Sequence, residues 1–569
     1  ALQKPRLGQD YELTLAGNAI TAATGRRPVL LRPAHAATPT TDTAAGADQA
    51  AWRQASASGY LTVLADRDTG DLGRPGVAAI MAAAQPAEGA GAVVRMHDSG
   101  GDRSQTVAAL DQLIPQLQAE GYRFVTVSQA LGLPAAPVAT TGERWRGYGL
   151  RLAQSTGHRL ANLLLIFTLI TAGVGILRLV FQLAGSWRHE RRSRRHRDGP
   201  FPYLGRVSVI VPAYNEAANI AASVRSILDS RYPDVEVVVV DDGSADATAT
   251  IVDRLGLPRV TLVRQLNAGK PAALNNGLRH ATGDLMVFVD GDTVLEPDTI
   301  SRLVQAFADD RVGAVSGYAK VVNRGGLLGR WQHLEYAVGF NLDRRMLDAA
   351  GCMPTIPGAI GAFRREALRD ARGVSAQTLA EDTDLTMTII RAGWQVSYEP
   401  AAVAWTEAPA TWRQLWRQRY RWSYGTLQVL WKHRHCLRGR GSTGRLGRWC
   451  LPYLLVFQVL LPLTAPIIDI YGIYGMATQP LGTIAMAWLG FTALQLATTA
   501  YALRLDRARL GPLWAAPLQQ ILYRQLNYLV VVQALVMALL GSRLPWHRMH
   551  RTGAAAAHVR FASLHTISI

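Results

Sequence analysis

The 569-residue sequence contains only three cysteines, Cys352, Cys436 and Cys450, and their spacing fits no metal-ligand or redox motif. It has fewer acidic than basic residues, 42 against 60, which leaves a formal net charge of +18. It also lacks a phosphate-binding loop, because Lys270 in NAGKPAALNNGL has a preceding glycine but none of the other residues of that motif. These absences argue against a disulfide framework, a cysteine metal site and a P-loop NTPase.

The surplus of positive charge is concentrated beside one apolar stretch. Residues 160–177, LANLLLIFTLITAGVGIL, carry no charge, and residues 187–197, WRHERRSRRHR, hold six arginines against one glutamate. An apolar stretch of about 20 residues crosses a bilayer as a helix. A basic run alone is also typical of a nucleic-acid arm. Because this run directly follows a membrane span, we expect it to face the cytoplasm and contact anionic lipid, with no nucleic-acid partner.

Three further apolar stretches, at roughly 449–476, 481–503 and 513–541, are each long enough to span a membrane. Arg524 interrupts the last of them, so PLQQILYRQLNY could instead form an interfacial or re-entrant helix. One span before the cytoplasmic domain and three after it would leave the basic C-terminal tail outside. The number of spans and the side of the tail therefore stay open.

Between the membrane segments, the pattern alternates between strands and helices. The apolar runs VSVIVPAYN (207–215), VEVVVVDDGS (235–244), VTLVRQ (260–265) and DLMVFVDGD (284–292) read as buried strands, and helical periodicity separates them. Such alternation predicts a parallel sheet with helices on both faces. Ligands of these sheets bind beyond the carboxyl ends of the strands, where the acidic clusters of this sequence fall.

The run LMVFVDGDTV (285–294) ends in two aspartates around a glycine. Asp290 and Asp292 can project to the same side of the strand end, and two such carboxylates repel each other unless a cation joins them. Oxygen ligands of this kind suit Mg²⁺ or Mn²⁺ held on a substrate phosphate. The alternative is a solvated turn. With Lys270 ahead of a helix, the pattern favours a nucleotide-sugar site.

Six motifs occur in one order: PAYNE, DDGS, GK before ALNNGL, DGD, AEDTDL and QRYRW. This order resembles the processive, membrane-embedded glycosyltransferases of family 2, which include poly-N-acetylglucosamine, chitin-oligosaccharide, hyaluronan and cellulose synthases. The resemblance covers roughly residues 205–435 and the membrane helices after them. It implies an α/β GT-A (Rossmann-like) domain joined to transmembrane α-helices.

The resemblance also implies roles for individual residues. Asp382 is the expected general base, with Glu381 beside it to raise its pKa. Asp290 and Asp292 would hold Mg²⁺ or Mn²⁺, and Gln418, Arg421 and Trp422 would close over the diphosphate and the acceptor sugar. The expected substrate-binding residues are Pro212, Tyr214, Glu216, Asp241, Asp242, Lys270, Asp290, Trp546 and Arg548.

Two of these segments can also be interpreted as having a purely structural role. Asp382 and Asp384 could serve as helix N-caps, which is compatible with catalysis. Residues 411–433 could form an interfacial helix without a catalytic role. Their aromatic residues recur every four positions, at Trp412, Trp416, Tyr420 and Tyr424, a stripe suited to a membrane interface.

The N-terminal 140 residues resemble a part of the NodB-type polysaccharide deacetylases. The resemblance rests on residues 95–131, on DRDTGD (66–71) and on LLRPAH (30–35), where His35 replaces an aromatic residue; His97 matches a late catalytic histidine. The early T-F-D-D-G motif and the H-x-x-x-H metal ligands do not precede residue 30. A zinc hydrolase without them lacks its metal and its base. We expect a partial, inactive deacetylase-type (β/α) segment in which His97 is structural.

Together, these features predict an inverting membrane enzyme that adds GlcNAc from UDP-GlcNAc to a growing β-linked polysaccharide and couples synthesis to export. The deacetylase-like segment favours UDP-GlcNAc over UDP-glucose. The alternatives are transfer of a single sugar to a lipid or other acceptor, a UDP-glucose-using glucan synthase, and a non-catalytic nucleotide-sugar sensor. The expected partners are the UDP-sugar, the polysaccharide acceptor and membrane lipid, and accessory export subunits stay open.

The expected location is the inner (plasma) membrane, with the N-terminal segment extracytoplasmic and the glycosyltransferase domain cytoplasmic. The predicted divisions are a deacetylase-like segment at 1–140, a linker at 141–158, a membrane helix at 159–186, a basic linker at 187–204, the GT-A domain at 205–410, interfacial helices at 411–445, membrane helices at 446–541 and a tail at 542–569.

Overall fold

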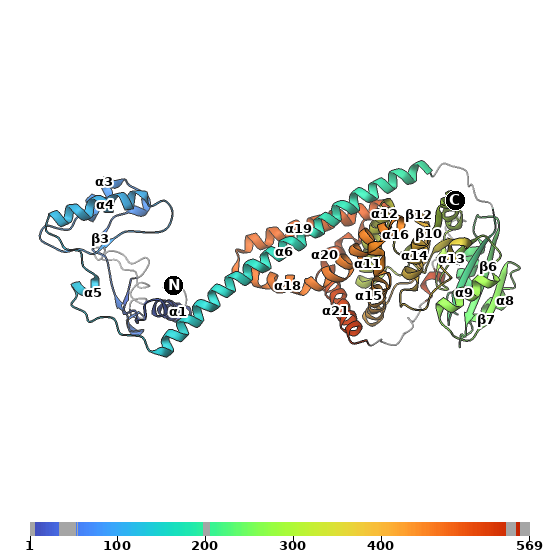
Figure 1. The fold of residues 1–569 in the computed structure, drawn as a ribbon, viewed down its shortest axis with the longest axis horizontal. Helices are drawn as coiled ribbons and strands as arrows, with labels where there is room; N and C mark the ends of the chain where they lie inside the picture. The colour runs from blue at the N-terminus through green and yellow to red at the C-terminus, as the bar shows by residue number, and fades with distance from the viewer. Residues whose placement is uncertain (1–5, 33–52, 54, 197–204, 542–552, 558–569) are drawn as a thin grey trace. The chain divides into compact units, whose positions relative to one another are not determined.

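The computed structural model describes residues 6–32, 53, 55–196, 205–541 and 553–557 (Figure 1). The chain divides into two compact units, Ala1–Leu163 and Leu164–Ile569. Trp546, Arg548 and His35, which the sequence singled out, lie outside the described residues.

The second unit is built on an eight-stranded sheet with the strand order β7-β6-β5-β8-β11-β10-β12-β9. The four strands expected from the apolar runs are neighbours and all parallel. They are β5 (Val207–Ala213), β6 (Val235–Asp242), β7 (Val260–Gln265) and β8 (Leu285–Phe288). The predicted parallel sheet is thus confirmed for this half.

The other half of the sheet is mixed. β11 (Gly361–Arg364) runs antiparallel to both β8 and β10 (Val312–Val321), and β12 (Gln395–Thr406) then runs parallel to β10. The short strand β9 (Val294–Leu295) pairs antiparallel with β12 at the edge. The expectation of an all-parallel sheet is therefore too simple, because β11 is reversed between two parallel groups and β9 is reversed at the edge.

Side chains of the parallel strands alternate between two apolar cores. Val209 and Val211 of β5 pack with Ile220 of α7 (Ile220–Leu228) on one face. Ile210 packs with Ala273 of α9 (Lys270–His280) on the other face. Both faces are covered, which is why these strands read as continuous apolar runs instead of alternating polar and apolar residues.

Three helices are long and apolar enough to cross a membrane, or four if one bent pair counts as a single span, among the described residues. They lie in α6 (Thr141–His196), in the helical run Gly441–Thr478, and in α19 (Leu481–Leu505). The bent pair joins Gly511–Gln519 to α21 (Tyr523–Leu539) at an angle of 51°. Its break lies beside Arg524, where the sequence predicted an interfacial or re-entrant helix.

The described piece of the C-terminal tail lies against the sheet domain. The backbone N–H of Ala555 donates to Glu407 Oε1 at 3.4 Å, and Ala555 is fully buried. A Cβ on Gly553 would lie 3.9 Å from both the Cβ and the carbonyl oxygen of Ala218. These contacts bring residues 553–557 to the same part of the molecule as the carboxyl end of β12.

The aromatic stripe of α15 (Trp412–His433) packs inside the protein, so the expectation of a membrane-interface stripe is wrong for two of its members. Tyr420 and Tyr424 are each 5% exposed and pack against Val530 and Ala534 of α21. Helix α21 covers this face, and the sequence of α15 alone could not reveal that neighbour. Only Trp412, at the helix start, remains exposed.

The first unit consists of short β and α elements. Two parallel strand pairs, β1 with β2 and β3 with β4, form separate two-stranded sheets. The elements described are α1 (Arg6–Thr24), β1 (Leu30–Leu31), β2 (Leu61–Thr62), β3 (Arg67–Asp68), η1 (Asp71–Gly73), α3 (Val77–Ala84), β4 (Val94–Arg95), α4 (Ser104–Ala119) and α5 (Val127–Ala130). This β/α alternation is compatible with the expected partial segment, and the deacetylase assignment stays a prediction.

Candidate active site

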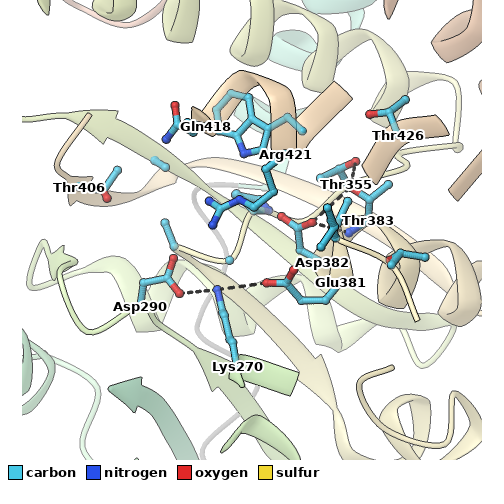
Figure 2. Close-up of a pocket in the computed structure, with 18 of the residues that line it drawn as sticks. Lys270, Asp290, Thr355, Glu381, Asp382, Thr383, Thr406, Gln418, Arg421 and Thr426 are labelled. Atoms are coloured by element: carbon cyan, nitrogen blue, oxygen red, sulfur yellow. Dashed lines mark hydrogen bonds and ion pairs between the residues drawn. The ribbon is translucent and has the colours of Figure 1, made fainter. Parts of the chain in front are cut away.

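A cavity of about 720 Å³ opens at the carboxyl ends of β5, β6 and β8 (Figure 2). Most of the residues that the sequence singled out line it: Pro212, Tyr214, Glu216, Asp242, Lys270, Asp290, Asp292, Glu381, Asp382, Gln418, Arg421 and Trp422. Asp241 is not among the lining residues, and its expected role in substrate binding stays a prediction. Successive residues of a strand point to opposite faces, and Asp241 and Asp242 therefore diverge.

Lys270 joins two of the predicted carboxylates. It is the first residue of α9, and its Nζ lies 2.5 Å from Asp290 Oδ1 and 3.7 Å from Glu381 Oε1. Burial by itself would lower the pKa of Lys270, but these carboxylates raise it overall. Lys270 therefore carries a positive charge in the cavity, between Asp290 and the start of the helix that bears Asp382.

Two glycines permit this close packing. A Cβ on Gly358 would lie 2.3 Å from Lys270 Nζ and 3.4 Å from Asp290 Oδ2, so a side chain there would displace the ion pair. A Cβ on Gly291 would lie 3.2 Å from Glu216 Cγ. The sequence did not reveal the role of Gly358, because its neighbours in the cavity come from distant segments.

Asp290 and Asp292 differ in how accessible they are to a divalent metal. Asp290 is partly exposed to the cavity, and Asp292 is 1% exposed. No cluster of three or more His, Cys, Asp or Glu side chains suited to a metal occurs among the described residues. These carboxylates fit a metal that takes its remaining ligands from a substrate diphosphate and water, with Lys270 sharing Asp290.

Asp382 lies in the first turn of α14 (Glu381–Arg391), and Ala380 is the N-cap. The alternative of an N-cap role for Asp382 and Asp384 is therefore wrong. Asp382 Oδ1 accepts a hydrogen bond from its neighbour's backbone, Thr383 N–H, at 2.7 Å. Burial and the adjacent Glu381 raise the pKa of Asp382 to about 6, against the opposing charge of Lys270.

Helix α15 forms the opposite wall. Gln418, Arg421 and Trp422 all line the cavity, as their helical spacing predicted. The Trp422 ring packs edge-on against Phe340, with centroids 5.6 Å apart. Figure 2 shows Arg421 extending from its helix toward the space between Asp290 and Asp382. A negatively charged group in that space would meet both Arg421 and Lys270.

Asp242 shapes the loop before α9. Its carboxylate accepts hydrogen bonds from Gln265 Nε2 at 2.7 Å and from the backbone N–H groups of Ala268 and Gly269, each at 2.9 Å. Gly269 adopts a φ of 88°, in the region that favours glycine. Asp242 thus fixes the turn that places Lys270 in the cavity. The strand-end pattern did not reveal this role.

The cavity extends toward the helices that are long and apolar enough to cross a membrane. Asp343, Tyr453 and Gln458 line that end. Asp343 accepts hydrogen bonds from Tyr453 Oη at 2.6 Å and from Arg178 Nη2 at 2.7 Å. These residues come from three segments far apart in the sequence, so no local motif could have predicted that they meet.

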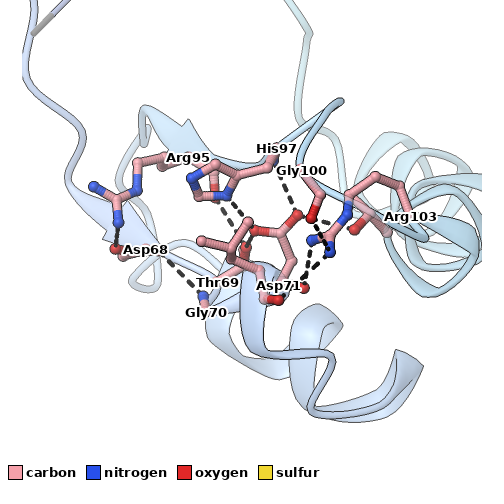
Figure 3. A network of polar contacts seen from close by, with 10 residues as sticks. Asp68, Thr69, Gly70, Asp71, Arg95, His97, Gly100 and Arg103 are labelled. Carbon is pink, nitrogen blue, oxygen red and sulfur yellow. Dashed lines mark hydrogen bonds and ion pairs between the residues drawn. The ribbon is translucent and has the colours of Figure 1, made fainter. Parts of the chain in front are cut away.

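The first unit contains a separate polar network (Figure 3). Asp71 is 1% exposed and accepts hydrogen bonds from His97 Nδ1 at 2.8 Å, His97 N at 2.9 Å and Thr106 Oγ1 at 2.9 Å. Burial alone would raise the pKa of Asp71, but these hydrogen bonds lower it to about 2. A role of His97 in packing, which was the preferred interpretation, stays a prediction.

Residues 205–425 match the family model described as glycosyltransferase like family 2. The poly-beta-1,6-N-acetyl-D-glucosamine synthase of Staphylococcus epidermidis is 30% identical over 263 residues, which are 45% of this chain and 62% of that protein. The synthase of Staphylococcus aureus (strain COL) is 30% identical over 258 residues, 45% of this chain and 61% of that protein. The chain thus spans less than two thirds of the length of these relatives.

Two solved structures are also similar. The mannosyltransferase PcManGT from Pyrobaculum calidifontis, in complex with GDP-Man and Mn²⁺, gives a TM-score of 0.46 at 26% identity and covers 64% of this chain and 99% of that chain. TarS 1–349 of S. aureus gives a TM-score of 0.32 at 17% identity and covers 60% of this chain and 94% of that chain. From the family match and the sheet described above, residues 205–425 are a glycosyltransferase family 2 domain with a GT-A-like α/β fold, homologous to poly-beta-1,6-N-acetyl-D-glucosamine synthases.

Proposed function

We propose that the protein transfers GlcNAc from UDP-GlcNAc to the end of a growing β-linked polysaccharide, with inversion at the anomeric carbon. The observation that carries this proposal is the cavity in which Asp382 faces Lys270, Asp290 and Arg421. Homology to poly-beta-1,6-N-acetyl-D-glucosamine synthases supports the choice of sugar and of a polymer as acceptor.

In the proposed reaction, Asp382 accepts the proton of the acceptor hydroxyl as that oxygen bonds to the anomeric carbon. The bond from this carbon to the diphosphate breaks at the same time, and UDP leaves with the electron pair. Lys270 and Arg421 stabilise the negative charge that develops on UDP. Asp290 and Asp292 would hold Mg²⁺ or Mn²⁺, which adds positive charge there when bound.

The two sides of the cavity suggest how the substrates are arranged. Pro212, Tyr214 and Glu216 lie at or just beyond the carboxyl end of β5, where the uridine is proposed to bind. Gln418 and Trp422 of α15 lie across the cavity and offer an amide and an aromatic face to the acceptor sugar. Aromatic faces suit the apolar face of a sugar ring, because the ring is otherwise poorly hydrated there.

The membrane-associated helices support a proposal of coupled export. Asp343, Tyr453 and Gln458 extend the cavity from the reacting groups toward helices apolar enough to span a bilayer. A chain elongated at this site could therefore move directly into the membrane region. The proposed arrangement has the glycosyltransferase domain in the cytoplasm and the N-terminal unit outside the inner membrane.

The test is incorporation of radiolabelled UDP-GlcNAc into polymer by the full chain in nanodiscs, with Mg²⁺ or Mn²⁺. The wild type should form high-mass product, and Asp382→Asn should lower the rate by about 10²–10⁴-fold, the range for a lost general base. Asp309→Asn is the control, because Asp309 pairs with Arg311, two residues away and outside the cavity. Consumption of UDP-glucose instead, or a single-sugar lipid product, would replace the proposed donor or acceptor.

A further inference from the structure

The helix that bears the proposed base and the helix that carries Arg421 are held together by one stripe of contacts. On α15, Gln418 and Arg421 face the cavity, and Gly425, Gln428 and Lys432 follow at intervals of three or four residues. Residues so spaced lie along one face of a helix. The face that lines the cavity therefore continues, beyond Arg421, into contacts with α14.

Gly425 is the first of these contacts. A Cβ at this position would lie 2.7 Å from the Cβ and 2.8 Å from the backbone nitrogen of Ala380, the N-cap of α14. Such distances require the two helices to separate. One turn further on, Gln428 Oε1 accepts a hydrogen bond from the backbone N–H of Leu379 at 2.8 Å.

Asp384 supplies the last contact. It lies two residues after Asp382 but points away from the cavity, and it is fully buried. Its carboxylate accepts hydrogen bonds from Lys432 Nζ at 2.7 Å and His433 Nε2 at 2.8 Å, at the end of α15. A buried carboxylate held by two donors from one helix fixes the distance between that helix and its own.

We infer that Gly425, Gln428, Lys432 and His433 of α15, together with Asp384 of α14, form a register clamp that sets the position of Asp382 relative to Arg421. The clamp residues are positioning residues, because none touches the space between Asp290 and Asp382. A base and a charge-stabilising arginine on two separate helices need such a link, since a displacement of about 1 Å can cost a hundredfold in rate. The kinetic consequence rests on the proposed function, whereas the contact itself does not.

The test uses the full chain in nanodiscs and two variants that disrupt the clamp in different ways. Lys432→Met removes the ammonium group that pairs with the Asp384 carboxylate, and Gly425→Ala inserts a methyl group between the helices. Both should speed hydrogen exchange of the backbone amides at 379–388 and leave those of β5 unchanged. Both should lower kcat by about tenfold to a hundredfold while the donor KM changes less than twofold, because the donor pocket is untouched. Lys432→Arg should restore exchange and kcat.

Gly329→Ala is the matched control. A Cβ on Gly329, in α11, would lie 2.5 Å from the carbonyl oxygen of Asn323, an equally tight contact outside the cavity, so this variant should lower stability without changing exchange at 379–388. Unchanged exchange at 379–388 in both clamp variants, or a donor KM that rises as much as kcat falls, would overturn the clamp. If the wild type transfers nothing from UDP-GlcNAc, the proposed function fails, and hydrogen exchange still decides the clamp because it needs no donor.

Discussion

Individual carboxylates in and beside the cavity differ in what surrounds them. Asp242 is engaged by the loop before α9, Asp290 by Lys270, and Asp384 by α15. Among the described residues, Asp382 accepts hydrogen bonds only from the backbone N–H and the hydroxyl of Thr383, and Glu381 lies beside it. Its carboxylate is therefore the one most available to take a proton.

The raised pKa of Asp382 predicts an acid limb in the rate of transfer. A base must be unprotonated to act, so kcat should be constant above about pH 7 and fall as the pH drops through about 6. Glu381→Gln removes the nearby negative charge and should move this limb to lower pH. The pH profile of kcat at saturating donor measures both effects, and a limb that stays in place in Glu381→Gln would exclude this cause.

Lys270 is predicted to bind the diphosphate of UDP. Lys270→Met should weaken UDP binding about tenfold to a hundredfold, the equivalent of the 1.5–3 kcal/mol of a hydrogen bond to a charged group. Isothermal titration calorimetry with UDP measures this change. Arg264→Gln, which removes an exposed ion pair with Asp253, is the control and should bind UDP like the wild type. Equal affinities of Lys270→Met and the wild type would remove Lys270 from the site.

At the scale of elements, two arginines of α15 that are two positions apart have different surroundings. Arg421 lines the cavity, whereas Arg419 is 5% exposed and pairs with Glu335 of α11 (Gly326–Glu335) and with Tyr523 of α21. The difference follows from helical geometry, because residues i and i+2 point to nearly opposite sides. The QRYRW motif contains both arginines and does not by itself distinguish them.

Arg419→Gln should therefore affect mainly stability, and Arg421→Gln mainly the rate of transfer. The first breaks a buried ion pair, which costs about 3–5 kcal/mol, and should lower the midpoint of thermal unfolding. The second should leave that midpoint unchanged and lower kcat for transfer. Thermal unfolding followed by tryptophan fluorescence, with transfer assays on the same samples, separates the two. A stable Arg419→Gln protein would contradict the proposed task of that pair.

In the first unit, Asp71 joins η1 to the loop after β4 through His97 and to α4 through Thr106. Its pKa of about 2 lies below the ordinary value of 3.8, so it contributes stability that is fully present above about pH 4 and is lost as the pH falls through about 2. The shift corresponds to about 2 kcal/mol. Asp71→Asn should speed proteolysis within residues 55–135 of the full chain at pH 7, and this difference should shrink toward pH 3.

At the scale of the whole molecule, the tail contact bears on the membrane arrangement. Ala555 and Gly553 lie against Glu407 and Ala218 of the glycosyltransferase domain, so the tail lies on the side of that domain. Because the chain must then end on the same side of the membrane as this domain, only two of the three late apolar stretches can cross it. The bent pair Gly511–Gln519 and Tyr523–Leu539 is accordingly predicted to be re-entrant.

Cysteine accessibility tests this arrangement in intact cells, because the native cysteines are buried. A membrane-impermeant maleimide should label Ser104→Cys in the first unit but neither Ser230→Cys in the glycosyltransferase domain nor Ala557→Cys in the tail. After permeabilisation all three should react. Labelling of Ala557→Cys before permeabilisation would mean that the bent pair crosses the membrane as a full span.

The sequence alone determined β5, β6, β7 and β8 and the acids at their ends, because apolar runs and the chemistry of strand ends are local properties. It also indicated Asp382 and the cavity face of α15 through motif order and helical spacing. Only the tertiary structure decided that β11 is reversed, that Asp241 turns away, that Tyr420 and Tyr424 pack on α21, and that Asp384 reaches Lys432. Each of these depends on which distant segments become neighbours, and pairing over long sequence separations is set by the packing of the whole domain.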